Sequence, residues 1–149
     1  MELPLNFTIK EHRLKDAIAV SSQIPEFENP YGIDEYKKRF AGVAHHILTA
    51  YKDNQSVGFK IGYDRYHDGS LYSWMGGVIP KFRRFRVAEL LADKQESWAK
   101  SKGYEAIILK TRKKYKAMLH FCEKRGFTIV ETIQKLSDSE TRIILKKLL

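Results

Sequence analysis

The most informative segment of the chain is Val78-Ile79-Pro80-Lys81-Phe82-Arg83-Arg84-Phe85-Arg86-Val87-Ala88. It continues a mostly apolar run, places three arginines within four residues, and leads into a sequence typical of a helix. A strand–loop–helix junction directs free backbone N–H groups and the positive end of the helix dipole outward, which suits a phosphate. Arginine adds charge and forked hydrogen bonding. The segment predicts a pyrophosphate cradle, with a solvated basic turn as an equally weighted alternative.

Length and composition indicate an ordinary globular protein. The chain has 149 residues, of which 43% are hydrophobic and 30% charged, so we expect a single domain over residues 1–149. The start of the sequence lacks the long apolar core of a signal peptide, and no apolar run approaches membrane-spanning length. One cysteine, Cys122, excludes an internal disulfide and disfavours a zinc site. We therefore expect a cytoplasmic protein without a metal or a membrane partner.

The charge is strongly positive and unevenly spread. A net charge of +9 favours an anionic partner, which could be nucleic acid, an acidic surface or a polyphosphorylated cofactor. Basic residues cluster over 81–86 and again over 110–116. In contrast, residues 23–36 carry four carboxylates and no lysine or arginine. A basic protein with one acidic segment is suited to two unlike partners.

Patterns of apolar residues and turn signals predict the order of the elements. Turn signals at Asp53-Asn54 and Asp68-Gly69 separate three strand-like runs, which favours an antiparallel meander. The predicted order is β-α-α-β-β-β-α-β-α-β-β, an α+β fold whose mixed, mostly antiparallel central sheet is flanked by helices. The expected strands are 6–10, 45–51, 56–63, 71–79, 104–110, 127–132 and 141–145, and the expected helices are 14–24, 34–40, 86–102 and 115–124.

Some local signals point in more than one direction. Gly76-Gly77 lies near the end of a predicted strand, where it indicates either a bulge, a bend or a place where a ligand lies against the backbone. His45 and His46 are adjacent in a strand and so point to opposite faces, which disfavours a shared metal. Trp74 and Trp98 are expected in the core.

The predicted order, with a basic loop between the fourth strand and the third helix, resembles the GNAT superfamily of N-acetyltransferases over nearly the whole chain. Residues 78–91 resemble its acetyl-CoA signature, Val-x-Pro followed by Arg/Gln-x-x-Gly-x-Gly/Ala and a Leu-Leu pair. Arg83 takes the Arg/Gln place and Ala88 the final Gly/Ala place. Residues 119–127 resemble the family's Leu/Phe-Tyr-Glu-Lys-x-Gly-Phe. The resemblance implies the acyl-CoA N-acyltransferase fold.

The resemblance also implies acetyl-CoA as cosubstrate and an amine as acceptor. The backbone N–H of Val78 would polarise the thioester carbonyl, and Val78 and Ile79 would hold the pantetheine arm. The residues implied in cofactor binding are Val78, Ile79, Arg83, Arg84, Phe85, Arg86, Val87, Ala88 and Phe121.

Three positions depart from the family pattern. Arg86 stands at the family's middle glycine, where a positive φ would cost free energy. Cys122 stands where many members carry a tyrosine taken to protonate the departing thiolate, although a small buried hydrophobe is the favoured interpretation. Tyr115 stands where the family often has asparagine. It lies two helical turns from Cys122, roughly 10 Å along the axis, and is a poorly placed substitute.

The acceptor side is less well defined. In the family, the region between the first two helices borders the acceptor site, and the carboxylates of residues 23–36 with Phe27, Tyr31 and Tyr36 would suit a cationic amine. The alternative, slightly favoured, is a helix N-terminus with favourable acids, Asp34 and Glu35, together with an exposed loop. The candidate bases are Glu26, Glu28, Glu35, Tyr72 and Ser73. Cys122, Tyr115 and Glu35 are carried forward as catalytic candidates.

Three functions follow in order of preference. The first is an acetyl-CoA-dependent N-acetyltransferase acting on a primary amine of a small molecule or peptide. The second is a catalytically weak acyl-CoA-binding relative with a regulatory role. The third is a nucleic-acid-binding module, which is disfavoured because its basic clusters lack stacking aromatics beyond Phe82, Phe85 and Tyr115. A homodimer is compatible with any of the three.

Overall fold

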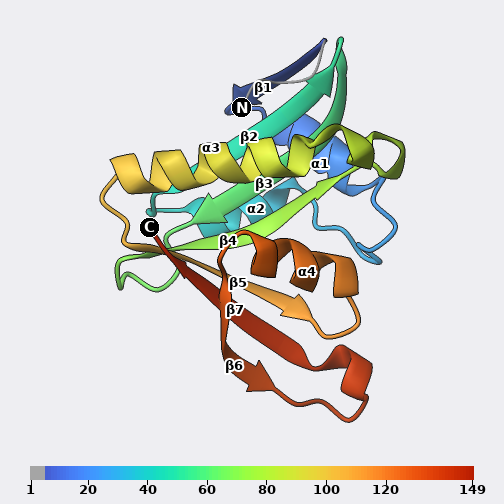
Figure 1. Cartoon of the computed structure of the whole chain (residues 1–149). Coiled ribbons are helices and arrows are strands. Elements are labelled where there is room, and N and C mark those ends of the chain that lie inside the picture. The colour runs from blue at the N-terminus through green and yellow to red at the C-terminus, as the bar shows by residue number, and fades with distance from the viewer. Residues whose placement is uncertain (1–5) are drawn as a thin grey trace.

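A seven-stranded mixed sheet forms the centre of the molecule (Figure 1), in a computed structural model that describes residues 6–149. The strands are β1 (Phe7–Glu11), β2 (His45–Lys52), β3 (Gln55–Tyr63), β4 (Ser70–Val78), β5 (Ala106–Arg112), β6 (Thr128–Ile133) and β7 (Arg142–Leu148). The helices are α1 (Leu14–Ser21), α2 (Ile33–Phe40), α3 (Val87–Ser101) and α4 (Lys116–Lys124), with 3-10 turns η1 (Pro80–Phe85) and η2 (Asp138–Glu140). The predicted element order is confirmed.

The strands follow the order β1-β2-β3-β4-β5-β7-β6 across the sheet. β4 and β5 are parallel, and every other neighbouring pair is antiparallel. The mixed, mostly antiparallel sheet predicted from the sequence is therefore confirmed. The end of α1 differs from the prediction by three residues, and every other helix end agrees within one residue. α1 ends at Ser21 because the chain then turns to pack Ile24 against β4, and α3 begins at Val87 because Arg86 is not helical.

Helices cover both faces of the sheet. In Figure 1, α3 and α4 lie in front of the sheet, and α1 and α2 lie behind it. One buried cluster joins α1, α2 and the start of α3 to strands β1–β4, with Val20, Tyr36, Phe59 and Leu91 almost fully enclosed. A second cluster lies under α4 and joins Cys122 to residues of β5 and β7.

β4 and β5 pair only at their beginnings. The parallel register joins residues 70–72 to residues 106–108 and then stops. Beyond Tyr72, β4 continues to Val78 with β3 as its only described strand neighbour, while β5 continues to Arg112 beside β7. Figure 1 shows the two arrows diverging towards their tips. Two adjacent strands thus present unpaired backbone edges to each other near the centre of the sheet.

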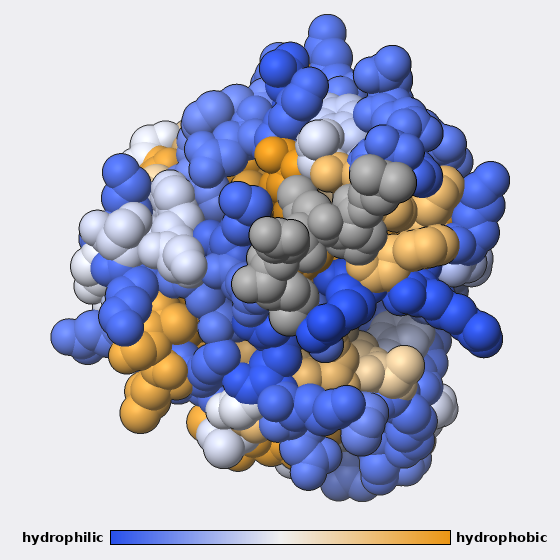
Figure 2. Space-filling model, turned by 45° about the horizontal axis from the view of Figure 1, so that its top comes forward, coloured by the Kyte–Doolittle hydropathy of each residue, from blue (hydrophilic) through white to orange (hydrophobic). Residues whose placement is uncertain are grey.

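The surface reflects the composition. The face drawn in Figure 2 is mainly hydrophilic, with smaller hydrophobic patches between the polar groups. Among the helices that residues 6–149 form, none is both long enough and apolar enough to cross a bilayer.

Candidate active site

Arg86 has the left-handed backbone conformation. Its φ is 62° and its ψ is 18°, and it forms the junction between η1 and α3. The family resemblance places a glycine here because only glycine reaches this region without steric cost. The loop therefore keeps a positive φ at this position although the residue is arginine. Arginine therefore adopts a conformation that costs roughly 1–2 kcal/mol for a residue with a Cβ.

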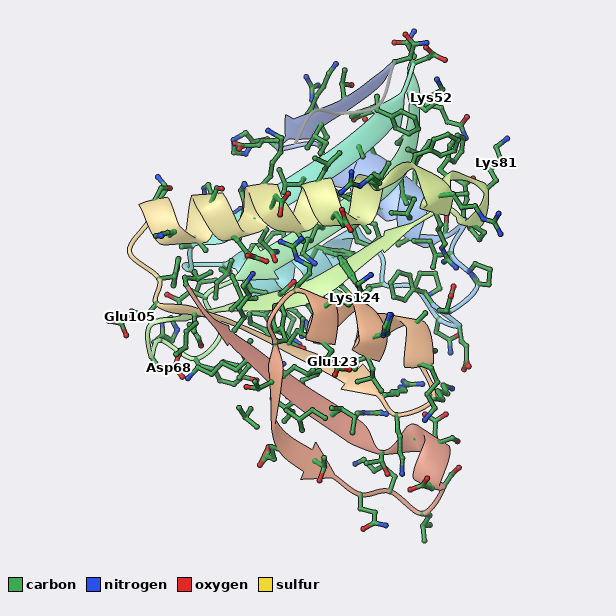
Figure 3. The ribbon with its side chains drawn as sticks, viewed as in Figure 1. Lys52, Asp68, Lys81, Glu105, Glu123 and Lys124 are labelled. Atoms are coloured by element: carbon green, nitrogen blue, oxygen red, sulfur yellow. The ribbon has the colours of Figure 1, made fainter. Side chains whose placement is uncertain are left out.

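The start of α3 is open to an anion. The helix begins at Val87 without a side-chain cap, so the N–H groups of its first turn point out of the helix end. Arg84, Phe85, Arg86 and Ala88 are all exposed around it. The guanidinium of Arg86 pairs with Glu89 at 3.1 Å, with both side chains largely in solvent. Lys81 extends outward from the same loop (Figure 3). Charge and backbone donors are therefore gathered at one helix end, as a phosphate requires.

Arg83 is held by other protein groups. Its Nε donates a hydrogen bond of 2.9 Å to the carbonyl of Val78, and its two terminal nitrogens donate to the carboxylate of Glu26 at 3.1 and 2.9 Å. This bidentate pair lowers the pKa of Glu26, chiefly through the hydrogen bond. The implied contact between Arg83 and a phosphate stays a prediction, and it would need Arg83 to leave Glu26.

The register directs the N–H of Val78 into the region where β4 has no partner. Ile79 donates its N–H to the carbonyl of Val57 at 2.8 Å, so the backbone groups of Ile79 face β3. Backbone groups of successive residues in a strand point to opposite sides, and those of Val78 and Gly76 therefore face away from β3. The carbonyl of Val78 is taken by Arg83, whereas its N–H points to the diverging edge of β5.

The strand is regular at the two glycines Gly76 and Gly77, and packing explains the second of them. Gly76 and Gly77 lie opposite Lys60 and Phe59 in a regular register. The irregularity in β4 comes earlier, where the register shifts between Met75 and Ser73. A Cβ at Gly77 would lie 2.6 Å from Cδ1 of Ile24, so the glycine makes room for the chain after α1. Of the alternatives considered for Gly76-Gly77, the bulge is wrong, packing against Ile24 explains Gly77, and a ligand lying against this backbone stays a prediction.

The two candidate acids, Cys122 on α4 and Tyr115 just before it, lie in unlike surroundings. Cys122 is buried in the second core cluster, as a small hydrophobe would be, and burial raises the pKa of its thiol. Phe121 beside it is half-buried under the guanidinium of Arg125. Tyr115 precedes α4, and its hydroxyl donates to the carbonyl of Glu26 at 3.2 Å. A role for either residue as acid stays a prediction.

Lys60 is a residue that sequence reasoning missed. It belongs to β3 and lies opposite Gly76, so β4 stands between its backbone and the divergence from β5. Burial lowers the pKa of its ammonium, while Cys122 and Glu96 are close enough to act on it in the opposite direction. No ion pair within 4.0 Å holds it among the residues described. The available signal was a lysine on the same strand face as two glycines, Gly58 and Gly62.

Three of the four carboxylates in the acidic segment lie beside the protein's own cations. Besides the pair between Glu26 and Arg83, Glu28 lies 3.8 Å from Lys114. Glu35 accepts a hydrogen bond of 2.9 Å from Arg39, one turn later in α2. The structure brings Glu26 to Arg83 in the loop before α3, whereas Glu35 lies on α2 beside Arg39. This arrangement favours the structural interpretation of the acids over a site that awaits a cationic amine.

The remaining candidate bases are poorly suited to take a proton. Tyr72 is buried, and burial raises the pKa of its hydroxyl. Ser73 is also buried. His45 and His46 point to opposite faces of β2 as expected: His45 is exposed and stacks on Phe40, and His46 is buried against Trp98. A hollow of about 350 Å³ lies elsewhere, between α3 and the end of β7, away from the diverging strands.

Comparisons with known proteins agree with this geometry. The family model described as the acetyltransferase (GNAT) family matches residues 17–127. Ard1 from Thermoplasma volcanium superposes with a TM-score of 0.82 at 21% identity, covering 97% of this chain and 99% of its own. Naa50 from Arabidopsis thaliana, in complex with a bisubstrate analogue, superposes with a TM-score of 0.78 at 18% identity, covering 96% and 99%.

A third structure carries the cosubstrate implied by the family resemblance. A GNAT family acetyltransferase from Elizabethkingia anophelis with acetyl-CoA bound has a TM-score of 0.74 at 18% identity, covering 98% of this chain and 100% of its own. At these identities the likeness shows a shared fold. Among curated proteins, none matches the sequence of this chain.

Proposed function

The chain belongs to the acetyltransferase (GNAT) family, and we propose that it transfers the acetyl group of acetyl-CoA to a primary amine of a small molecule or peptide. The observation that carries the proposal is the N–H of Val78, which points to the divergence of β4 and β5 a short distance along the chain from the open start of α3. We further propose that residues 1–149 act as one domain in the cytoplasm.

The phosphates of acetyl-CoA would bind at the start of α3. The N–H groups of the first helical turn and the side chains of Arg84 and Arg86 supply the donors there, and Arg86 would exchange Glu89 for a phosphate. Val87 and Ala88 form the first turn itself, and Phe85 packs on Phe7 beside it. The pantetheine arm would then follow the unpaired edge of β4 at Val78 and Ile79, with Phe121 of α4 on the other side.

The reaction joins two bound groups. The lone pair of the amine attacks the acetyl carbon, a C–N bond forms, the C–S bond breaks, and CoA leaves as a thiolate. The amine gives up a proton, and the thiolate takes one. The N–H of Val78 would stabilise the negative charge that develops on the carbonyl oxygen. Holding the amine and the thioester together supplies a large share of the acceleration.

The thiolate needs only modest help. A free thiol has a pKa of about 8.5, so a thiolate that leaves near neutral pH is a fair leaving group. We propose Lys60, Cys122 and Tyr115 as the groups to test for this proton. Of the three, Lys60 is the one whose charged form burial disfavours, which makes its ammonium a better donor. Glu35 would act on the amine side, provided that it can leave Arg39.

Calorimetry with acetyl-CoA and with acetyl-pantetheine tests the phosphate site. We expect acetyl-CoA to bind more tightly, since each charge-assisted contact contributes roughly 1.5–3 kcal/mol. Equal affinities would exclude a phosphate site at α3. Release of CoA in the presence of a panel of primary amines tests the transfer. Tight binding of acetyl-CoA with no amine acetylated would instead support a regulatory acyl-CoA-binding protein.

A further inference from the structure

Lys60 lies between two glycines on its own strand. Gly58 and Gly62 stand two residues before and after it, on the same face of β3. A Cβ at Gly58 would lie 3.4 Å from Cδ1 of Leu91 in α3. A Cβ at Gly62 would lie 3.0 Å from Nε2 of Gln95, one turn later in the same helix. α3 therefore packs directly on the backbone of β3 on both sides of Lys60, which leaves little room above the lysine.

The side chain of Lys60 leans across β4 instead. Gly76 is its partner on β4, and a Cβ at Gly76 would lie only 3.5 Å from Cγ of Lys60. Because Gly76 has no side chain, the four-carbon stem of the lysine can cross β4, over a strand spacing of about 4.8 Å. The ammonium is close enough to Cys122 of α4 to interact with its thiol, and α4 packs on β5 and β7. The amine therefore lies on the α4 side of the sheet, near the point where β4 and β5 part.

The surroundings of this amine disfavour its charged form. Burial has the largest effect and lowers the pKa of Lys60, and the positive charge of Arg125 adds to it. Cys122 and Glu96 act in the opposite direction, but the carboxylate of Glu96 already pairs with Arg125 at 2.9 Å and with Lys147 at 2.6 Å. A larger share of Lys60 than of an exposed lysine is therefore the neutral amine, which is the nucleophilic form.

The strand register brings this amine to the stretch of β4 where the acetyl group would lie. In the function proposed above, the N–H of Val78 holds the thioester carbonyl, and the pantetheine arm arrives from α3 past Ile79. The acetyl end of the ligand would therefore extend from Val78 towards Gly76. Lys60 crosses β4 at the level of Gly76, two residues or about 7 Å from Val78 along the strand. The amine and the acetyl group thus converge on the same unpaired edge.

We propose that Nζ of Lys60 accepts the acetyl group of bound acetyl-CoA when no acceptor amine is present, and that the resulting amide inactivates the protein. The proposal rests on the acetyltransferase function proposed above and adds a site of self-modification to it. The lone pair of Nζ attacks the acetyl carbon, a C–N bond forms and the C–S bond breaks. CoA leaves as a thiolate and takes up the proton that the nitrogen loses.

Acetylation would remove what Lys60 supplies to the transfer reaction. The amide carries no positive charge and has no acidic proton to give to a departing thiolate. The added acetyl group would also fill the space beside Gly76 into which the next thioester extends. The acceptor amine and Lys60 would therefore compete for the same acetyl group, so that activity is retained while the acceptor is abundant and lost when acetyl-CoA is present alone.

Incubation with acetyl-CoA in the absence of any amine tests the modification. Peptide mapping by mass spectrometry over time gives the rate of acetylation at each lysine. We expect Lys60 to be acetylated first, at a rate that saturates with acetyl-CoA, is suppressed by excess CoA and rises with pH as the neutral amine forms. Surface lysines, which react without a binding site, should show neither saturation nor suppression. Activity towards an amine should fall in proportion to the fraction of Lys60 acetylated.

Two variants separate Lys60 from the other lysines. Lys60→Arg retains a positive charge but has no nucleophilic amine, so its activity should not decline from its own starting rate during the incubation. Lys94→Arg changes an exposed lysine of α3 and should decline as the parent does. An acceptor amine added before acetyl-CoA should protect Lys60 in the parent and in Lys94→Arg.

The outcomes distinguish this inference from the proposed function. Binding of acetyl-CoA and acetylation of an added amine, with Lys60 never modified, would overturn the self-modification and retain the proposed function. Full activity of the protein acetylated at Lys60, or passage of the acetyl group from Lys60 to an added amine, would overturn the inactivation. A protein that binds no acetyl-CoA in calorimetry would contradict the proposed function and the self-modification together.

Discussion

Arg83 and Glu26 form a bidentate ion pair between segments 57 residues apart in the chain, joining the loop before α3 to the loop after α1. The same loop after α1 accepts the hydroxyl of Tyr115 on the carbonyl of Glu26. Three separate parts of the chain therefore meet at Glu26. A carboxylate that the sequence suggested for the acceptor thus contacts the proposed phosphate loop.

The pair makes stability depend on pH through Glu26. The hydrogen bond from Arg83 lowers the pKa of Glu26 from its ordinary value of 4.5, so the folded state binds fewer protons than the unfolded state near that value. The stabilisation is present above the ordinary pKa and is lost as the pH falls through the folded pKa. We expect Glu26→Gln to lower the melting temperature at pH 7 and to reduce its acid dependence. The effect should be below about 1 kcal/mol because both side chains are partly exposed.

Thermal unfolding of both proteins between pH 3 and 7 measures this. The control is Glu28→Gln, because Glu28 is more exposed and 3.8 Å from its partner. Identical pH dependence in the parent and Glu26→Gln would show that the pair contributes nothing.

Replacing Arg86 with glycine should separate stability from ligand binding. Glycine reaches φ near 62° without a Cβ clash, so we expect Arg86→Gly to stabilise the fold by about 1 kcal/mol after the loss of chain entropy. The same change removes a phosphate donor and should weaken acetyl-CoA binding roughly tenfold. Chemical denaturation and calorimetry measure the two effects.

The matched control for Arg86 is Arg84→Gly, which deletes the same side chain two residues earlier, where φ is not positive. It should weaken binding without stabilising the fold. Stabilisation in both variants would refute the strain at Arg86.

Gly77 should not tolerate alanine. Its Cβ would lie 2.6 Å from Cδ1 of Ile24, which is buried, so we expect Gly77→Ala to destabilise the fold by roughly 1–3 kcal/mol. Gly76→Ala meets nothing nearer than 3.3 Å and should cost less. Adding Ile24→Val removes the clashing methyl group and should recover part of the loss. If the second change recovers nothing, the contact with Ile24 is not what selects the glycine.

We expect the pKa of Lys60 to determine where kcat declines at high pH. If its ammonium protonates the thiolate, Lys60→Met should lower kcat about 10²-fold or more, with little change in acetyl-CoA affinity. The charged form is the donor, so activity of the parent should decline as the pH rises through the lowered pKa of Lys60, and this decline should be absent in the variant. Stopped-flow measurement of CoA release across pH 6–10 gives both quantities.

Cys122→Ala and Tyr115→Phe serve as comparisons in the same assay. Because Cys122 is in the core, we expect Cys122→Ala to lower the free energy of unfolding and to change kcat little. A fall in kcat for either of these, with Lys60→Met fully active, would assign the proton to α4 or its preceding residue.

The elements and the strained loop could be predicted because their causes are local. Alternation in β5 and the turn signals between β2, β3 and β4 lie within a few residues of the structures they determine. The left-handed Arg86 followed from one position in a motif. The partners of Arg83 and Tyr115 could not be predicted, because both lie more than fifty residues away at Glu26. The reason for Gly77 could not be predicted either, because Ile24, the residue that it makes room for, comes from a distant segment.

The early end of pairing between β4 and β5 gives the sheet a vacancy with the shape of a short strand. A ligand whose amide groups are spaced like those of a peptide would occupy it by completing the hydrogen-bonded ladder, so that the protein and the ligand together form one continuous sheet. Occupancy should then be visible as slowed hydrogen–deuterium exchange at the amides of Gly76 and Val78, which face the vacancy, and not at Gly77, which already faces β3.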